Sequence, residues 1–276
     1  MSEQGELERI LRRAGSVRDH EIDLAEAALA LGALDRPRVG LERYREHLNS
    51  LALQIRHGGA ELRDAEAAAG LLRQSIAVDL GYEGDRLNYD DMQNANLLRV
   101  IDRRRGLPVA LAILYIHGAR AAGWQITGVA FPAHFLIRLE HGGQRAIIDP
   151  FNGGNRLDAP GLRQLTKTIA GDGAELSPSY LQPIGNRDVL LRLQNNILSR
   201  DLAGGRLQRA QIVLRRMLLI APERADLHRQ NALLAARQDN MGDAIAAAER
   251  YAALATHEEQ RHEAALLLQQ LKKQLN

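Results

Sequence analysis

The chain has 276 residues, more than one average domain, and 45% of them are hydrophobic, which is enough to build a substantial core. It contains no cysteine, so disulfides, thiolate metal sites and thiol nucleophiles are excluded together. The formal net charge is only +2 and aromatic residues make up 4%, which argues against a nucleic-acid partner. Because no apolar run is long enough to span a membrane, and because the charged stretch 1–15 lacks the apolar centre of a secretory signal, we expect a cytoplasmic protein with no membrane contact.

The first 80 residues have the apolar spacing of helices, with one apolar residue every three or four positions. The segments with this spacing are 6–14, 20–34, 39–55 and 60–79. We therefore predict a helical N-terminal unit over 1–80. The polar, turn-rich stretch 81–96 comes next, and we expect it to tie this unit to the following one, with Asn94 or Asn96 capping the next helix.

A nearly all-apolar helix is predicted over 109–122, after the step Gly106-Leu107-Pro108. A helix that is apolar on every side is a buried helix. Three strand-like runs follow it, over 125–132, 133–140 and 144–151. We expect the helix to lie against the sheet that these runs form, within a central unit that covers 81–183.

The hairpin between the last two of these strands contains two consecutive glycines, which suit tight turns. A loop of residues 141–142 would pair His134 with Asp149, whereas a loop of residues 142–143 would place Leu136 opposite Asp149. Strand side chains alternate with a period of two. Both registers therefore predict that the imidazole of His134 and the carboxylate of Asp149 share one face as direct or diagonal neighbours.

The segment from Asp158 to about Asn186 contains three prolines, and we expect it to be mixed and loop-like. Only helices are predicted after it, over 188–202, 205–220, 223–237, 241–255 and 257–274. The pairs Arg209-Ala210 and Asp243-Ala244 lie 34 positions apart, a period that resembles tetratricopeptide repeats. The tail 184–276 is thus predicted to be a short helical array that offers a surface to a protein partner.

Two further features are expected to be structural. Arg103 to Arg105 is the one short basic run, and we expect it to be the solvated end of a helix. The nine histidines are scattered, and none has the spacing of a metal site. The sequence predicts neither a metal nor a cofactor.

Six short motifs stand between residues 77 and 158: Gly81-Tyr82-Glu83-Gly84, Tyr89-Asp90-Asp91, Asn94, Arg103-Arg104-Arg105-Gly106-Leu107-Pro108, Phe131-Pro132-Ala133-His134-Phe135 and Asp149-Pro150-Phe151-Asn152-Gly153-Gly154. A chain with these motifs resembles the SirB1 family, a branch of the transglutaminase-like superfamily. The helices before the motifs and the repeats after them also fit that family. The resemblance implies an α+β fold: a helical N-terminal unit, a papain-like antiparallel sheet with a buried central helix, and an all-α repeat tail.

Enzymes of the transglutaminase-like superfamily use a Cys-His-Asp triad in which the cysteine opens the central helix. That layout suits cysteine chemistry, because the helix N-terminus stabilises a thiolate and the histidine takes its proton. By the resemblance, His134 matches the family histidine and Asp149 the aspartate. Where the SirB1 branch commonly has a serine, this chain has Ala110, and the phenol of Tyr115 is the one hydroxyl between residues 106 and 123.

Two interpretations of this pair follow, and we favour the first. In the first, His134 and Asp149 are an inherited pair that pins two strands, within a non-catalytic protein that acts by protein interaction or regulation. In the second, the chain is a hydrolase or transferase on peptide or amide bonds, with His134 as the base. A third, weaker hypothesis is a regulatory ligand pocket lined by Tyr89, His134 and Phe151.

Overall fold

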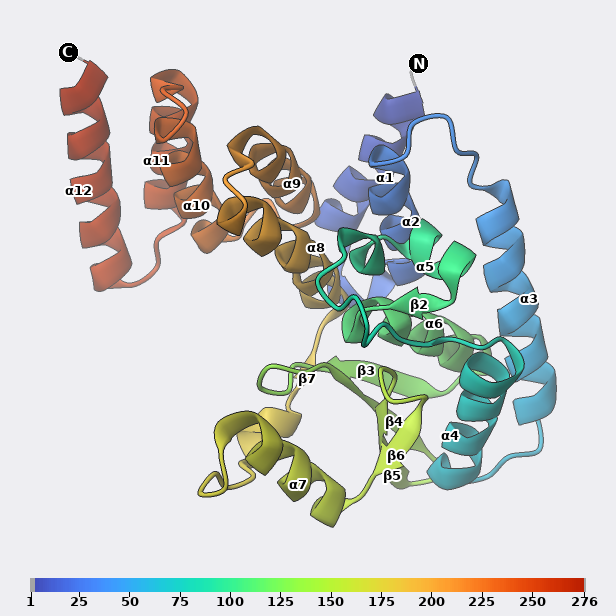
Figure 1. Cartoon of the computed structure of the whole chain (residues 1–276). Helices are drawn as coiled ribbons and strands as arrows, with labels where there is room; N and C mark the ends of the chain where they lie inside the picture. Colours follow the sequence, from blue (N-terminus) through green and yellow to red (C-terminus); the bar gives the residue numbers. More distant parts are fainter. Residues whose placement is uncertain (1–2, 276) are drawn as a thin grey trace.

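The computed structural model describes residues 3–275 and begins with four α-helices (Figure 1). They are α1 (Glu3–Ser16), α2 (Leu24–Leu34), α3 (Glu42–Gly59) and α4 (Ala65–Arg73), with a 3-10 turn at Asp19–Glu21 and a π-helical turn at Gln74–Asp79. Aspartates start two of them, since Asp23 and Asp64 accept hydrogen bonds from the backbone N–H groups three residues later. The helical N-terminal segment was therefore predicted correctly from its periodicity.

The next elements lead into the central helix α6 (Pro108–Ala121). They are β1 (Glu83–Gly84), a 3-10 turn at Met92–Ala95, α5 (Leu97–Arg103) and β2 (Arg105–Gly106), and the two short strands pair in parallel. Asn96 caps α5 by accepting from the N–H of Arg99 at 3.2 Å. Proline at the first helical position suits α6, because the N–H that proline lacks would have no partner there.

Helix α6 lies between the N-terminal helices and a five-stranded antiparallel sheet with the order β6-β5-β4-β3-β7. The strands are β3 (Gln125–Val129), β4 (Leu136–His141), β5 (Gln144–Asp149), β6 (Asn155–Leu157) and β7 (Pro183–Ile184). The strand face toward α6 includes Ile126, Ile137 and Ile148, which belong to the main hydrophobic core. This arrangement confirms the predicted α+β class with a buried central helix.

The segment after Asp158 differs from the prediction, because it contains the helix α7 (Ala159–Ala170). Asp158 caps this helix by accepting from the N–H of Gly161 at 2.8 Å, and Pro160 lies in its first turn, where proline is favoured. Leu162 of α7 packs in a second cluster with Val129 and Leu136 of the sheet. The proline marks a helix start here, not a loop.

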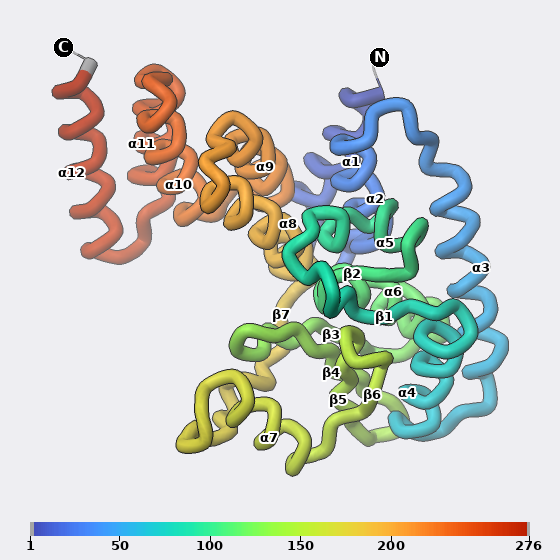
Figure 2. Tube along the Cα trace, in the orientation of Figure 1, coloured from blue at the N-terminus to red at the C-terminus, as the bar shows by residue number. Residues whose placement is uncertain are grey.

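The chain ends in five helices that stack in one row leading away from the sheet, with the C-terminus at the far end of the row (Figures 1 and 2). They are α8 (Asn186–Ala203), α9 (Leu207–Ile220), α10 (Ala225–Ala236), α11 (Met241–Leu254) and α12 (Glu258–Leu275). Ala210 and Ala244, 34 positions apart, are both fully buried. The helical character of the tail agrees with the prediction.

One continuous hydrophobic core joins the three predicted units. It includes Leu11 of α1, Leu111 of α6 and Met217 of α9, and α1 packs directly against α9. The division of the chain near residues 80 and 183 remains a prediction. Within residues 3–275, no helix is long and apolar enough to cross a lipid bilayer.

Candidate functional site

His134 and Asp149 meet at the end of the β4–β5 hairpin, where His134 Nε2 lies 2.9 Å from Asp149 Oδ2. The observed register pairs Ile137 with Ile148 and His141 with Gln144, which is the register of the loop 142–143. Asp149 is the last residue of β5, whereas His134 lies two residues before β4 begins, so the turn that precedes β4 brings the imidazole to the carboxylate. The structure brings together the two residues that the strand alternation placed on one face.

Asp149 accepts a complete set of hydrogen bonds. Its Oδ1 accepts from the backbone N–H groups of Phe151 and Asn152 at 3.0 and 3.2 Å, and its Oδ2 accepts from the Asn152 side-chain amide at 2.6 Å in addition to His134. Burial raises the pKa of the carboxyl, but the hydrogen bond and charge of His134 and the donors of Asn152 outweigh it, and the pKa lies below its ordinary value. Only 2% of the side chain is exposed.

A tight turn, and not a strand, positions His134. The sequence predicted a strand over 133–140, but β4 begins at Leu136, and the N–H of His134 bonds to the carbonyl of Phe131 at 3.0 Å. Ala133 has a positive φ of 49°, which is uncommon for a residue with a Cβ. Backbone strain of this kind persists where the surrounding structure fixes it, often near functional groups.

Phe151 connects the pair to the loop between β1 and α5. Its ring makes edge contacts with His134 and with Tyr89, at centroid distances of 6.2 and 5.7 Å. It also lies flat against Gly84, where a Cβ would collide with the ring. Tyr89, His134 and Phe151 are thus contiguous, but only Tyr89 and His134 of these three line the small pocket beside the pair.

The start of α6 faces the same small pocket as His134. Pro108, Val109, Tyr89 and His134 are among the lining residues, together with Arg192 of α8, and the space holds about 20 Å³. Ala110 is fully buried and does not line this pocket. The volume is little more than the ~10–15 Å³ that one water molecule requires.

Comparison with known proteins places this arrangement in a family. Residues 42–195, more than half of the chain, match the family described as the Transglutaminase-like superfamily. The UPF0162 protein of Xylella fastidiosa (strain Temecula1) is 30% identical over 221 residues, which are 79% of each chain. The chain belongs to the transglutaminase-like superfamily.

Other similarities extend this assignment without adding a function. The UPF0162 protein of Vibrio cholerae is 31% identical over 172 residues, 62% of this chain and 63% of that one. Human F-box only protein 21 is 32% identical over 123 residues, 44% of this chain but only 19% of its own length. The solved structure of menin covers 97% of this chain and 74% of its own, with a TM-score of 0.44 and 11% identity, a likeness too low to support an argument.

Two residues beside the pair are visible in the sequence, but no role is predicted for them there. Asn152 supplies two of the four donors to Asp149, and its place three residues after an aspartate in a Gly-rich turn was the available signal. The Tyr115 hydroxyl is buried beside Gly154 and has no hydrogen-bond partner within residues 3–275. Burial first, and then the nearby charge of Asp149, raises the pKa of this phenol.

The basic run Arg103 to Arg105 differs from the expectation of a solvated helix end. Arg103 pairs with the buried Asp85 at 2.9 Å and bonds to Asn94 at 2.9 Å, while Arg105 pairs with Glu83. The acidic and amide groups of the loop 81–96 face the end of α5. The arginines of this run therefore anchor that loop. Within residues 3–275, no cluster of three or more potential metal ligands is present.

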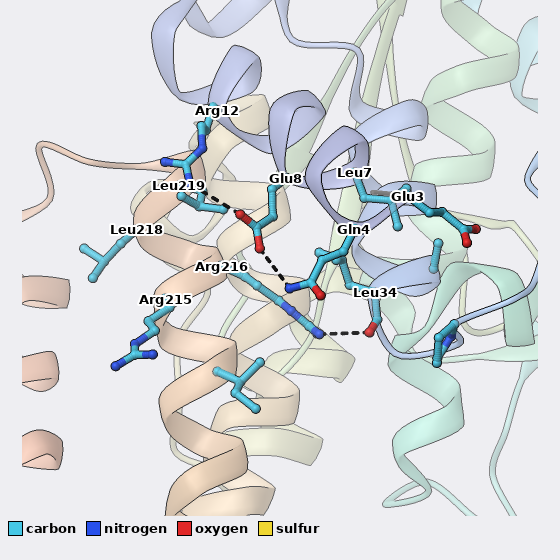
Figure 3. A pocket seen from close by; sticks show the side chains of 13 residues that line it. Glu3, Gln4, Leu7, Glu8, Arg12, Leu34, Arg215, Arg216, Leu218 and Leu219 are labelled. Carbon is cyan, nitrogen blue, oxygen red and sulfur yellow. Dashed lines mark hydrogen bonds and ion pairs between the residues drawn. The ribbon is translucent and has the colours of Figure 1, made fainter. Parts of the chain in front are cut away.

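A larger cavity than the space beside His134 lies elsewhere in the chain (Figure 3). It has a volume of about 630 Å³ between α1, the end of α2 and α9, with an apolar floor that includes Leu7, Leu34 and Leu219. The three arginines that line it are paired within the chain: Arg12 with Glu8, Arg215 with Asp243 and Arg216 with Asp35. None of the sequence-predicted site residues lines this cavity.

Proposed function

We propose that this transglutaminase-like protein is non-catalytic and acts by binding a protein partner through the array α8–α12. One observation carries the first half of this proposal. The helix start that faces His134 presents Pro108 and Val109, and neither side chain has an atom that can attack a carbonyl. In a catalytic triad the histidine takes a proton from the nucleophile, and here His134 has no such nucleophile to activate.

The hydrogen bonds of Asp149 support a structural role for the pair. A buried carboxylate costs free energy unless it is fully bonded, and Asp149 is fully bonded by donors from the turn before β4 and the turn after β5. The pair thus joins two turns at the same end of the neighbouring strands β4 and β5. The small volume beside it supports exclusion of a peptide substrate.

The array supports the second half of the proposal. A groove of about 280 Å³ lies between α8, α9 and α10, and its walls include Leu198, Leu202, Leu233 and Leu234. Leu202 and Leu233 are exposed, and exposed leucines that line one groove are typical of an interaction surface. We infer further that the 34-residue spacing reflects tetratricopeptide-like repeats, and that the chain belongs to the SirB1 branch, whose motifs it carries.

Quantitative affinity purification tests the proposal. The wild type is compared with Leu202→Glu and Leu233→Glu, and with Leu53→Glu as a control on the exposed surface of α3, outside the array. We expect one partner to be lost with both groove variants and retained with Leu53→Glu and with His134→Ala. A partner set that is identical for all variants would contradict the interaction role.

A second candidate, a hydrolase that needs no protein nucleophile, is favoured by one detail. Because His134 Nε2 bonds to Asp149, the ring nitrogen Nδ1 is the one available as a base, and the adjacent space has the size of a water molecule. Activity profiling on amide and ester libraries tests this candidate. Turnover that disappears in His134→Ala, with the fold intact, would establish it over the non-catalytic proposal.

A further inference from the structure

A second polar pocket lies on the surface between α3 and the end of α5 and shares no lining residue with the space beside His134. It has a volume of about 280 Å³ and is lined by Arg43, Tyr44, His47, Ile101, Asp102 and Arg104. Arginine side chains from two separate segments, α3 and the end of α5, converge in this pocket.

The single carboxylate of the pocket is already occupied. Asp102 pairs with Arg36 and Arg43, each at 2.8 Å, and accepts from the Tyr44 hydroxyl at 3.1 Å. Two guanidinium groups therefore share one negative charge. Arg43 remains accessible at the pocket mouth, with 62% of its side chain exposed.

Arg104 adds a positive charge with no acidic partner. Its guanidinium stacks over the Tyr82 ring, 4.5 Å from the ring centre, and its Nη1 contacts the Tyr82 hydroxyl and, at 3.0 Å, His47 Nε2. Both partners are neutral groups: burial, and then the charge of Arg104, lowers the pKa of His47, and burial raises the pKa of Tyr82. Arg104 forms no ion pair in the described part of the chain.

The backbone of Arg104 also points to a role for its side chain. Arg104 ends α5 in the left-handed region, with a φ of 59°, where glycine is the usual residue because it has no Cβ. A non-glycine residue persists in this conformation where the surrounding structure holds it. Here that side chain is held over Tyr82, with most of its donor fork free.

We propose that this pocket binds the phosphate group of a small phosphomonoester between Arg43 and Arg104. The lining groups and Arg36 supply three guanidinium charges against one carboxylate, so an added anion completes the charge balance. The two arginines approach from different segments, and a tetrahedral phosphate offers acceptors in more than one plane, whereas a carboxylate offers them in one. The volume accommodates the phosphate and a small organic group.

Thermal unfolding of the full chain at constant ionic strength tests this proposal, because a ligand that binds only the folded state raises Tm with its concentration. The probes are inorganic phosphate, phenyl phosphate, and benzoate as the matched carboxylate, with chloride making up the ionic strength. We expect both phosphates to raise Tm, and phenyl phosphate to do so at lower concentration than benzoate. A response to benzoate equal to that of phenyl phosphate, or no response to either phosphate, would overturn the assignment.

Three variants localise the effect. Arg43→Gln and Arg104→Gln are expected to weaken phosphate binding at least about tenfold, the loss typical of a charge-assisted hydrogen bond. Arg105→Gln is the control, because Arg105 is the adjacent arginine and pairs with Glu83 outside the pocket. If Arg104→Gln does not unfold cooperatively, the exposed Arg43→Gln decides the question. Unchanged binding in Arg43→Gln, or equal weakening in Arg105→Gln, would place any phosphate elsewhere.

Discussion

Two polar clusters stand at the two ends of one short segment, Arg104 to Pro108, and they differ in how their charges are balanced. At one end, Asp149 is buried and each of its oxygens accepts two hydrogen bonds. At the other end, Arg104 lies in an open pocket with neutral partners only. A cluster that satisfies itself serves the fold, whereas one that leaves a charge without a counterion is available to a ligand.

Each of the two clusters has a strained backbone residue beside it, and the strain positions a different kind of group in each. Ala133 adopts a positive φ in the closed turn that holds His134, and Arg104 adopts one at the edge of the open pocket. In the first case the strain orients a side chain toward a fixed internal partner. In the second, the side chain lies over the Tyr82 ring at the edge of the pocket where we propose that an anion binds.

The largest effect is expected from Asp149→Ala. The substitution leaves the buried donors of His134, Phe151 and Asn152 without an acceptor, and we expect the free energy of unfolding to fall by about 3–5 kcal/mol. Urea denaturation measures it. Asp90→Ala, at a carboxylate that is 89% exposed, is the control and should cost less than about 1 kcal/mol; similar losses in both would break the contrast between the clusters.

A matched pair of glycines tests the packing beside Asp149. Gly153 and Gly154 both have positive φ values, 68° and 69°, but an added Cβ would meet open space at Gly153 and collide with the Tyr115 hydroxyl at Gly154. We expect Gly153→Ala to cost about 1 kcal/mol from backbone strain alone, and Gly154→Ala about 2–3 kcal/mol. Equal losses would mean that the Tyr115 contact is not rigid.

The dependence of stability on pH in the acid range tests the lowered pKa of Asp149. Its pKa is lower in the folded protein than in the unfolded chain, so the unfolded state binds more protons in the acid range, and stability must rise with pH there. This contribution is complete above the unfolded value of about 3.9 and is lost as the pH falls through the folded value. Asp149→Asn should flatten that acid limb in urea titrations at each pH, and an unchanged limb would contradict the shift.

The smallest effect on stability is expected from Arg104→Gly. Glycine relieves the left-handed backbone while removing the stacking on Tyr82, and we expect these terms to leave the free energy of unfolding within about 1 kcal/mol of wild type. Phosphate binding should nevertheless be lost. Arg38→Gly, at an exposed residue with a φ of 77°, is the backbone control; a loss at Arg104 far beyond that of the control would make this arginine a structural residue like Asp149.

Local patterns predicted the elements that depend on local physics. The consecutive glycines of the hairpin and the strand alternation gave the two possible registers, and the structure selects the one with the loop 142–143. The apolar sequence of α6 indicated its burial on every side. The helices of both ends followed from their spacing, since burial of one apolar stripe is visible in the sequence.

Features that depend on contacts between distant segments were missed. Pairing of Arg103 with Asp85 requires the end of α5 to face the loop 81–96, and no local pattern contains that information. Helix α7 is absent from the prediction because proline disfavours a helix interior, whereas the cap by Asp158 makes Pro160 part of a helix start. His134 was placed in a strand because period-two patterns extend without a visible stop into turns.

A double-mutant cycle on His134 and Asp149 tests the central claim most directly. The free energies of unfolding of wild type, His134→Ala, Asp149→Ala and the double variant isolate the interaction of the two side chains from their other contacts. A structural pair predicts a coupling of at least about 1.5 kcal/mol, together with a large loss in the Asp149 single variant. A coupling below about 0.5 kcal/mol, with both single variants as stable as wild type, would contradict it.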